Sequence, residues 1–330
     1  MTSNDSYTVT QESIDSISDL WHDSANRLKW DCLFVLPGWL KVWWQAFGGD
    51  RTPYLCSIRS HGELIGMAPL MVEGQTARLM GDTNVCDFQD VVVLPGREKA
   101  FFDTLFDHLK KQGVRQLDLE AVRANSTLYR HLVSEAADQP YAVDCQSVDA
   151  TMVLDLPSSW DAYLRQLTGK QRHEVRRKFR RLEEAGRVAL RAIDDVTAVN
   201  SEMDTFLTLF KKNRTDKARF MTDQMASFFH ALAVELASAR ILRLFYLTLD
   251  DAIAAAVICF DYAEAFHLYN NGYDESYHYL SVGLLSKLLT IKKSIQLGRK
   301  TYDFLKGTEV YKHRLGGKQI PLYRCRVSLI

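Results

Sequence analysis

The chain has 330 residues, of which nearly half are apolar and a quarter are charged, the composition of a soluble globular protein. Lysine plus arginine balances aspartate plus glutamate, 41 of each kind, so the overall charge gives no attraction toward nucleic acid or a membrane surface. The six cysteines are scattered without a CxxC pair, which disfavours a zinc or redox motif and predicts buried free thiols.

The beginning of the sequence is polar and acidic and has no charged-then-apolar signal pattern. The longest plain apolar run, 252–260, is far too short to cross a bilayer. These features predict a cytoplasmic protein without a transmembrane segment, for which peripheral membrane association stays open.

In the first half, apolar spacing predicts a helix within 11–27, and 37–49 starts with proline and ends in Gly-Gly, as a short helix does. Residues 54–59 and 63–71 predict a β-hairpin. The further predicted elements are a strand at 90–94, a helix at 98–112, a strand at 116–120 and a helix at 126–137.

The second half repeats this order. It begins with a long basic helical region at 160–184 and a strand at 188–192. The later predicted elements are helices at 196–212 and 222–237, strands at 240–249, 252–260 and 265–270, a helix at 281–297, and strands at 301–305 and 323–329. The repeat is one of element order, because the residues themselves do not repeat.

A boundary between two domains is predicted in the segment 151–156, which precedes Pro157-Ser158-Ser159. We therefore expect an N-terminal domain at 1–155 and a C-terminal domain at 156–330. The last strand of the chain is a candidate to return to the N-terminal domain.

The first candidate site is the start of the helix at 281–297. Unpaired N–H groups and the helix dipole make such an end an anion site, and Gly283 would let a phosphate approach closely. Ser281 is expected to cap the helix. The segment Leu280, Ser281, Val282, Gly283, Leu284, Leu285 is thus a candidate pyrophosphate cradle, although a capped helix without a ligand explains it equally.

The second candidate site follows the strand at 301–305, in the stretch YDFLKGTEVYKHRLGG. Ligands gather at strand ends in α/β folds, and this predicted loop offers acid, base and cation groups. The candidate residues are Asp303, Lys306, Glu309, Tyr311, Lys312 and His313. A charged surface loop is the alternative, but the strand directly follows the cradle helix, so both sites should be neighbours.

A third feature is the basic helix within 169–187, on which Arg172, Arg176 and Arg180 repeat at a spacing of four. A solvated amphipathic helix explains most of this pattern. The functional alternative is that Arg172 and Arg176 hold a phosphate of the substrate. DNA binding is not expected, because the whole chain is neutral and no DNA-binding motif accompanies the helix.

Several motifs are absent from the sequence, namely GxxxxGK[ST], GxGxxG, GxSxG and HExxH. Their absence argues against P-loop NTPases, Rossmann dehydrogenases, common serine hydrolases and zincins. The nine histidines show no metal-ligand spacing, so no metal is expected.

The tail stretch closely resembles the YDFLRGxExYKxR signature of the CelD/BcsL-type acetyltransferases of the GNAT superfamily. Three further stretches are similar to segments of that family, and the resemblance covers roughly 30–325. They are TGKQRHEVRRKFRRLEEAG, CDFQDVVVLPGREKAFFDTLFDHL and SVGLLSKLLTIKKSIQLGRKTYDFL.

The resemblance implies an α/β fold of two tandem GNAT-like domains, each a mixed twisted sheet flanked by helices, as in the Fem peptidyltransferases. It also implies transfer of an acetyl or other acyl group from acyl-CoA to an amine or hydroxyl of a sugar, exopolysaccharide or cell-envelope precursor. The chain departs from the usual GNAT cradle, Gln/Arg-x-x-Gly-x-Gly/Ala, by carrying Leu280 and Leu285 at its first and last positions.

By chemistry we assign Glu309 or Asp303 as base, Tyr311 or Tyr273 as acid, and Lys306 as the cation that stabilises developing charge. A Fem-like transferase that uses aminoacyl-tRNA remains an alternative, although no long heptad arm is visible. A third possibility is a GNAT-like module that binds a ligand without catalysis.

Overall fold

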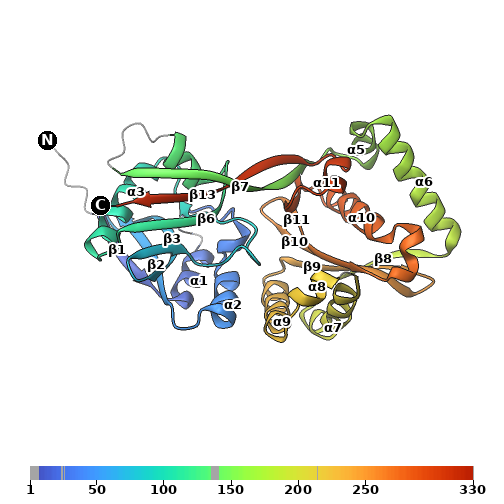
Figure 1. Ribbon diagram of the computed structural model, residues 1–330, viewed down its shortest axis with the longest axis horizontal. Coiled ribbons are helices and arrows are strands. Elements are labelled where there is room, and N and C mark those ends of the chain that lie inside the picture. The colour runs from blue at the N-terminus through green and yellow to red at the C-terminus, as the bar shows by residue number, and fades with distance from the viewer. Residues whose placement is uncertain (1–6, 24, 26, 135–140, 214, 330) are drawn as a thin grey trace. The chain divides into compact units, whose positions relative to one another are not determined.

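The computed structural model describes residues 7–23, 25, 27–134, 141–213 and 215–329 (Figure 1). The chain forms two compact units. Unit 1 comprises 1–150 together with 320–330, and unit 2 comprises 151–319. Each unit has its own group of strands and its own hydrophobic cluster.

Unit 1 is built on strands in the order β1-β2-β3-β4-β6-β13, in which only β4 and β6 pair in parallel. Helix α3 supplies buried phenylalanines to its core. The elements are β1 Tyr7–Glu12, α1 Ile14–His22, η1 Leu33–Val35, α2 Pro37–Phe47, β2 Thr52–Ser60, β3 Glu63–Glu73, β4 Thr76–Leu79, β5 Val92–Val93, α3 Glu98–Lys111, β6 Gln116–Arg123, α4 Thr127–Tyr129, η2 Arg130–Ser134, β7 Ala142–Asp155 and β13 Lys318–Ser328.

Unit 2 has the strand order β12-β11-β10-β9-β8, and the end of β7 pairs with β12. Here too the sheet is mixed, because β11 and β12 are parallel and the other pairs are antiparallel. The elements are α5 Trp160–Gln166, α6 Gly169–Ala185, β8 Val188–Ile193, α7 Val196–Asn213, α8 Thr215–Phe220, α9 Asp223–Ser238, β9 Leu242–Leu249, β10 Ala252–Tyr262, β11 Ala265–Tyr273, η4 Glu275–Leu280, α10 Val282–Gln296, β12 Thr301–Lys306 and α11 Val310–Arg314.

The sheet of unit 2 is covered on both faces, with α5, α6 and α10 on one and α7–α9 on the other (Figure 1). Alternation along β9 explains this arrangement, because successive side chains of a strand point to opposite faces. Phe245 packs in the core with α5, α6 and α10. Its neighbour Tyr246 donates its hydroxyl to the Glu202 carbonyl of α7, at 2.7 Å. The sheet is therefore a rigid middle layer that positions α10.

Most predicted elements are present, including α2, the β2–β3 and β9–β10 hairpins, and the order of helices and strands in both halves. The elements that were missed are β1, η1, β4, β7, α8, η4 and α11. The segment proposed as a domain boundary is the end of a 14-residue strand, β7. The helix predicted at 126–137 is interrupted after Tyr129, and 135–137 lie outside the described residues.

The prediction of free thiols holds for Cys32, Cys56, Cys86 and Cys259, which are buried. It is wrong for Cys145 and Cys325, which form a disulfide between β7 and β13. No sequence pattern indicates this pair, because its members are 180 residues apart and only the fold brings them together.

A charged cluster on the sheet of unit 1 gives a stability prediction. The Asp118 carboxylate, 5% exposed, accepts hydrogen bonds from Arg324 at 2.6 and 2.7 Å and from Arg78 at 2.7 Å. The Arg324 hydrogen bonds lower the pKa of Asp118. We expect Asp118→Asn to reduce the free energy of unfolding at pH 7 by about 2–3 kcal/mol, because charge-assisted bonds to a buried carboxylate are lost.

The pH dependence follows from the lowered pKa. The ionised carboxylate stabilises the fold above its unfolded pKa of about 4, and this contribution is lost as pH falls through the lower folded value. Urea unfolding at pH 7 and pH 3 should therefore show a smaller difference for Asp118→Asn than for the wild type. Equal stabilities of the two proteins at pH 7 would contradict the prediction.

Candidate active site

The sheet of unit 2 opens between two neighbouring strands. β11 and β12 pair in parallel at only three successive positions, from Ala265–Thr301 to His267–Asp303. Beyond Asp303, β12 bends, since Leu305 has a φ of 60° and donates its N–H to the Asp303 carboxylate at 2.8 Å. Within the described residues the ladder ends there, so the C-terminal halves of both strands border a gap in the sheet.

Helix α10 begins beside this gap, directly after β11 and the short η4 helix. An added Cβ on Gly283 would lie 2.7 Å from the Tyr273 ring, so only glycine fits under that ring. The first helical N–H groups, on Val282 and Gly283, have no acceptor within the described part of the chain. The start of α10 thus has the unpaired N–H groups that an anion site needs.

Ser281 does not cap α10 as expected, since its side chain makes no cap hydrogen bond. The residue has left-handed backbone angles, φ 58° and ψ 32°, which turn its hydroxyl away from the helix. The Ser281 hydroxyl instead accepts a hydrogen bond from Lys178 of α6, at 2.6 Å. The basic helix therefore reaches the start of α10 through Lys178, a contact that the sequence did not reveal.

The predicted tail loop is partly helical, because Val310–Arg314 forms α11. Lys312 of α11, only 3% exposed, points inward rather than toward a substrate. Its ammonium lies 2.9 Å from the Glu309 carboxylate and donates to the carbonyls of Lys306, at 2.5 Å, and Gly307, at 3.2 Å. Lys312 thus fixes the turn between β12 and α11, a role that differs from the predicted substrate contact.

Lys287 joins the start of α10 to α11. Its ammonium donates to the Gly283 carbonyl at 2.7 Å and lies 4.9 Å from the centre of the Tyr311 ring. Burial, the largest cause, together with the nearby ammonium groups of Lys217 and Lys312 lowers the pKa of Lys287 to about 7, against opposing effects of Glu309 and Cys259. The cradle and the tail are therefore neighbours, as the sequence predicted, and a lysine that titrates near neutrality lies between them.

Tyr311 is the most enclosed of the predicted acid groups. Burial raises the pKa of its hydroxyl, and the Glu309 carboxylate raises it further. The tyrosine keeps its proton at neutral pH, so it can only donate one. The Glu309 side chain is exposed, whereas that of its partner Lys312 is buried.

Several predicted residues are too buried to contact a ligand through their side chains. Leu280, Val282 and Leu285 belong to the core of unit 2, so only their backbone could take part in a cradle. Asp303 is 3% exposed and accepts a hydrogen bond from the Leu305 N–H of its own strand. Its carboxylate therefore holds the bend of β12. Tyr273, Leu284 and Lys306 are partly exposed beside the gap.

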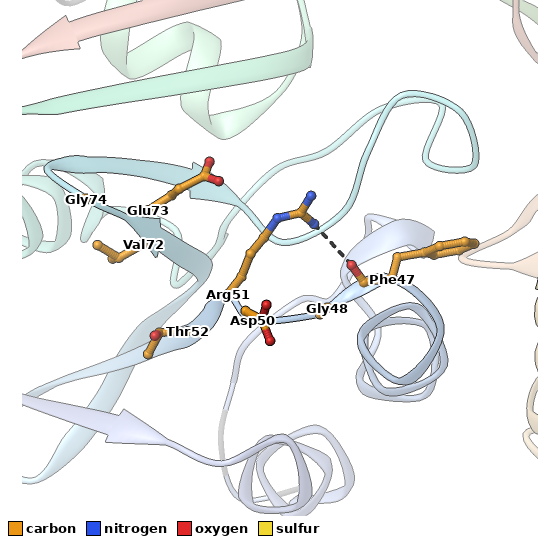
Figure 2. A pocket seen from close by; sticks show the side chains of 9 residues that line it. Phe47, Gly48, Asp50, Arg51, Thr52, Val72, Glu73 and Gly74 are labelled. Atoms are coloured by element: carbon orange, nitrogen blue, oxygen red, sulfur yellow. Dashed lines mark hydrogen bonds between the residues drawn. The ribbon is translucent and has the colours of Figure 1, made fainter.

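The remaining predicted residues lie elsewhere in unit 2. His313 is exposed on α11, and Arg172 is partly exposed near the start of α6. Arg176 lines a separate pocket between α5, α6 and α10. A hollow in unit 1 contains no predicted residue; there Arg51 donates to the Phe47 carbonyl at 3.2 Å (Figure 2).

Two further properties bear on ligands. In the described part of the chain, no group of three histidine, cysteine or acidic side chains is placed to hold a metal ion. None of the helices in the described ranges combines the length and apolar character that a bilayer-crossing segment needs.

Residues 169–313 match the family model described as an acetyltransferase (GNAT) domain. This segment is similar to GNAT-type acyltransferase domains. It contains the whole gap between β11 and β12 and the first residues of both α10 and α11. No curated protein matches the chain. A GNAT domain implies acyl-CoA as co-substrate, and the unpaired N–H groups under Tyr273 fit a pyrophosphate at the start of α10.

Solved structures resemble the chain beyond the GNAT segment. FemX has a TM-score of 0.65 at 12% identity, with 96% of each chain covered. A conserved protein of unknown function from Bacteroides thetaiotaomicron has a TM-score of 0.61 at 12% identity, with 98% of this chain and 100% of that chain covered. L-PGS from Bacillus licheniformis has a TM-score of 0.53 at 9% identity, with 88% and 90% covered. The predicted α/β class with GNAT-like units is confirmed.

Proposed function

We propose that the C-terminal domain, predicted at 156–330, transfers an acetyl or other acyl group from acyl-CoA to an amine or hydroxyl of a sugar, exopolysaccharide or cell-envelope precursor. The observation that carries the proposal is the bridge made by Lys287 between the Gly283 carbonyl and the Tyr311 ring. It puts a candidate anion cradle and candidate acid–base groups at one opening of the sheet. The CelD/BcsL-like tail sequence supports the envelope or polysaccharide acceptor.

The N–H groups of Val282 and Gly283 would hold the pyrophosphate of the co-substrate, because a helix start favours negative charge. Its thioester would then lie in the gap between β11 and β12. Bound acyl-CoA supplies an activated acyl group. What the protein must add is orientation, removal of a proton from the acceptor and return of a proton to the leaving thiolate.

Glu309 would act as the proton acceptor, since its carboxylate is exposed and the ion pair with Lys312 fixes its position. Tyr311 is the matching donor because its raised pKa keeps it protonated. Lys287 would act as a positioning residue. Its ammonium over the Tyr311 ring stabilises the negative charge that appears when the hydroxyl gives up its proton.

We expect Glu309→Gln to lower kcat by about 100-fold or more, since a positioned general base contributes about 10²–10⁴-fold. Steady-state acetyl transfer to a panel of amino sugars measures this. Glu264→Gln is the matched control, because Glu264 is likewise an exposed carboxylate paired with a lysine, Lys300. Full turnover by Glu309→Gln would remove Glu309 from the mechanism.

A second candidate function is Fem-like transfer from aminoacyl-tRNA, which the FemX-like fold and the basic face of α6 favour. Calorimetry distinguishes acyl transfer from acyl-CoA from transfer that uses aminoacyl-tRNA. Binding of acetyl-CoA supports the main proposal, whereas binding of tRNA that weakens steeply with salt supports the second. Absence of binding to either at millimolar ligand would favour a GNAT-like module without catalysis.

A cytoplasmic location belongs to the proposal because acyl-CoA is made and used there. Disulfides are rare in that compartment, so the Cys145–Cys325 bond of unit 1 is an unusual feature for such a protein. The acceptor contact predicted for Arg172 and His313 also stays part of the proposal.

A further inference from the structure

A second pocket of unit 2 lies between α5, α6 and α10, with a volume of about 230 Å³. One of its lining residues, Lys292, follows Gly283 by nine positions on α10. At a rise of 1.5 Å per residue this separates them by roughly 13 Å along the helix axis. The pocket is therefore distinct from the candidate active site.

The floor of this pocket is apolar. The rings of Trp160 and Phe179 meet almost at a right angle, 88°, with their centres 6.1 Å apart. Beneath them lie Leu164 and Val175, which are 5% and 4% exposed and belong to the core. Because the core holds these side chains in place, the aromatic surface is preformed, and a flat apolar body could stack on it without reorganising the protein.

The rim of the pocket is positively charged. Arg176 and Arg180 of α6 and Lys292 of α10 line it, against a single carboxylate, Glu183. Three cations against one carboxylate give a net charge of +2. Three like charges from two helices repel one another, so an anion bound among them would be favourable.

Two of the three cations are not neutralised. Within the described part of the chain, neither Arg176 nor Lys292 forms an ion pair, and Lys292 instead lies 5.9 Å from the centre of the Trp160 ring. Arg180 contacts Glu184 at 3.8 Å, a pair whose side chains are 71% and 68% exposed and which therefore contributes little. Unneutralised positive charge therefore lies at the rim of the aromatic pocket.

We propose that this pocket binds an amphipathic organic phosphate, whose apolar or aromatic body packs against Trp160 and Phe179 while Arg176 and Lys292 bind its phosphate. Arginine forms paired hydrogen bonds with phosphate oxygens, which favours this anion. The volume is below the roughly 300–1,000 Å³ typical of drug-sized ligands, so one ring with its phosphate fills it. The site is independent of the proposed acyl transfer.

Isothermal titration calorimetry with 1-naphthyl phosphate tests the proposal. We expect the double variant Arg176→Glu with Lys292→Glu to bind the probe at least tenfold more weakly than the wild type. Lys170→Glu is the control, because it reverses one positive charge on α6 outside the pocket, and it should bind within twofold of the wild type. Neutral 1-naphthol should bind the wild type at least tenfold more weakly than the phosphate.

Three results would overturn the proposal: no binding of 1-naphthyl phosphate at millimolar concentration, equal affinity of the double variant and the wild type, or equal affinity of 1-naphthol. Inorganic phosphate that binds as tightly as the probe would also overturn it, because the aromatic floor would then contribute nothing. Circular dichroism shows whether the double variant folds. If it does not, Arg176→Gln with Lys292→Gln removes the charges without reversing them and takes its place.

Discussion

Replacing Gly283 with valine should raise the dissociation constant of acetyl-CoA by at least about 100-fold, or roughly 2.7 kcal/mol. A Cβ at this position would lie 2.7 Å from the Tyr273 ring, so either the ring or the first turn of α10 must move. The added methyl groups would also lie beside the N–H groups proposed to hold the pyrophosphate. Calorimetry with acetyl-CoA, together with thermal unfolding, separates lost binding from lost folding.

Gly169→Val is the matched control for this variant. Gly169 is the first residue of α6, and an added Cβ there meets no atom within 4 Å. Its acetyl-CoA affinity should equal that of the wild type. If Gly283→Val keeps wild-type affinity, the start of α10 does not hold the co-substrate and the proposed acyl-CoA site is wrong.

Lys287→Met should lower kcat/KM by about 10–100-fold at pH 6 and remove a dependence on pH near neutrality. In the wild type, the ammonium loses its proton with a pKa of about 7, so its support for Tyr311 declines as pH rises through that value. The variant lacks the titrating group, and its activity should not show this decline. A pH series of acetyl transfer from pH 5.5 to 9 measures the difference.

The same substitution should stabilise the fold, which a purely structural lysine would not show. Folding lowers the pKa of Lys287 to about 7 from an unfolded value of about 10.4. Between these values the unfolded chain binds more protons, so the wild type gains stability as pH rises from 7 to 10. In Lys287→Met the stability no longer rises between pH 7 and 10. Below pH 7 the variant also avoids the free-energy cost of burying an ammonium group.

Several other ionisable groups lie around Lys287, so a control variant must leave them unchanged. Lys217, Glu309, Lys312 and Cys259 all influence its ionisation, and Tyr311 lies against it. Lys293→Met removes a lysine from the last turn of the same helix, and its pH profile should match the wild type. An unchanged profile in Lys287→Met would rule out its proposed role.

Local sequence signals predicted the parts of the fold that depend on local chemistry. Pro37 begins α2. Asp250 and Asp251 form the turn of the β9–β10 hairpin and have left-handed φ angles of 48° and 70°. α11 was missed because its five residues are too few to show helical periodicity. A boundary was predicted at 151–156 because Pro157-Ser158-Ser159 follows this segment, and the segment proves to be the end of strand β7.

The candidate site was predicted in outline, since the order of strand, helix and strand places Gly283 near the tail. Lys287 was not predicted, because a lysine on an amphipathic helix looks like a surface residue in the sequence. Its burial depends on α8, α11 and the bend of β12, which are tertiary features. The inward direction of Lys312 could not be foreseen for the same reason.

The last strand has a consequence for biosynthesis. β13 pairs with β6 from Leu322–Arg123 to Ser328–Gln116, yet all of unit 2 separates them along the chain. A ribosome therefore releases 1–150 long before the strand that completes its sheet has been made. Until then β6 presents an open edge, a surface prone to wrong pairing. We expect chain synthesis to be the most aggregation-sensitive stage in the life of this protein, and a stop codon near its end to disable the half that was made first.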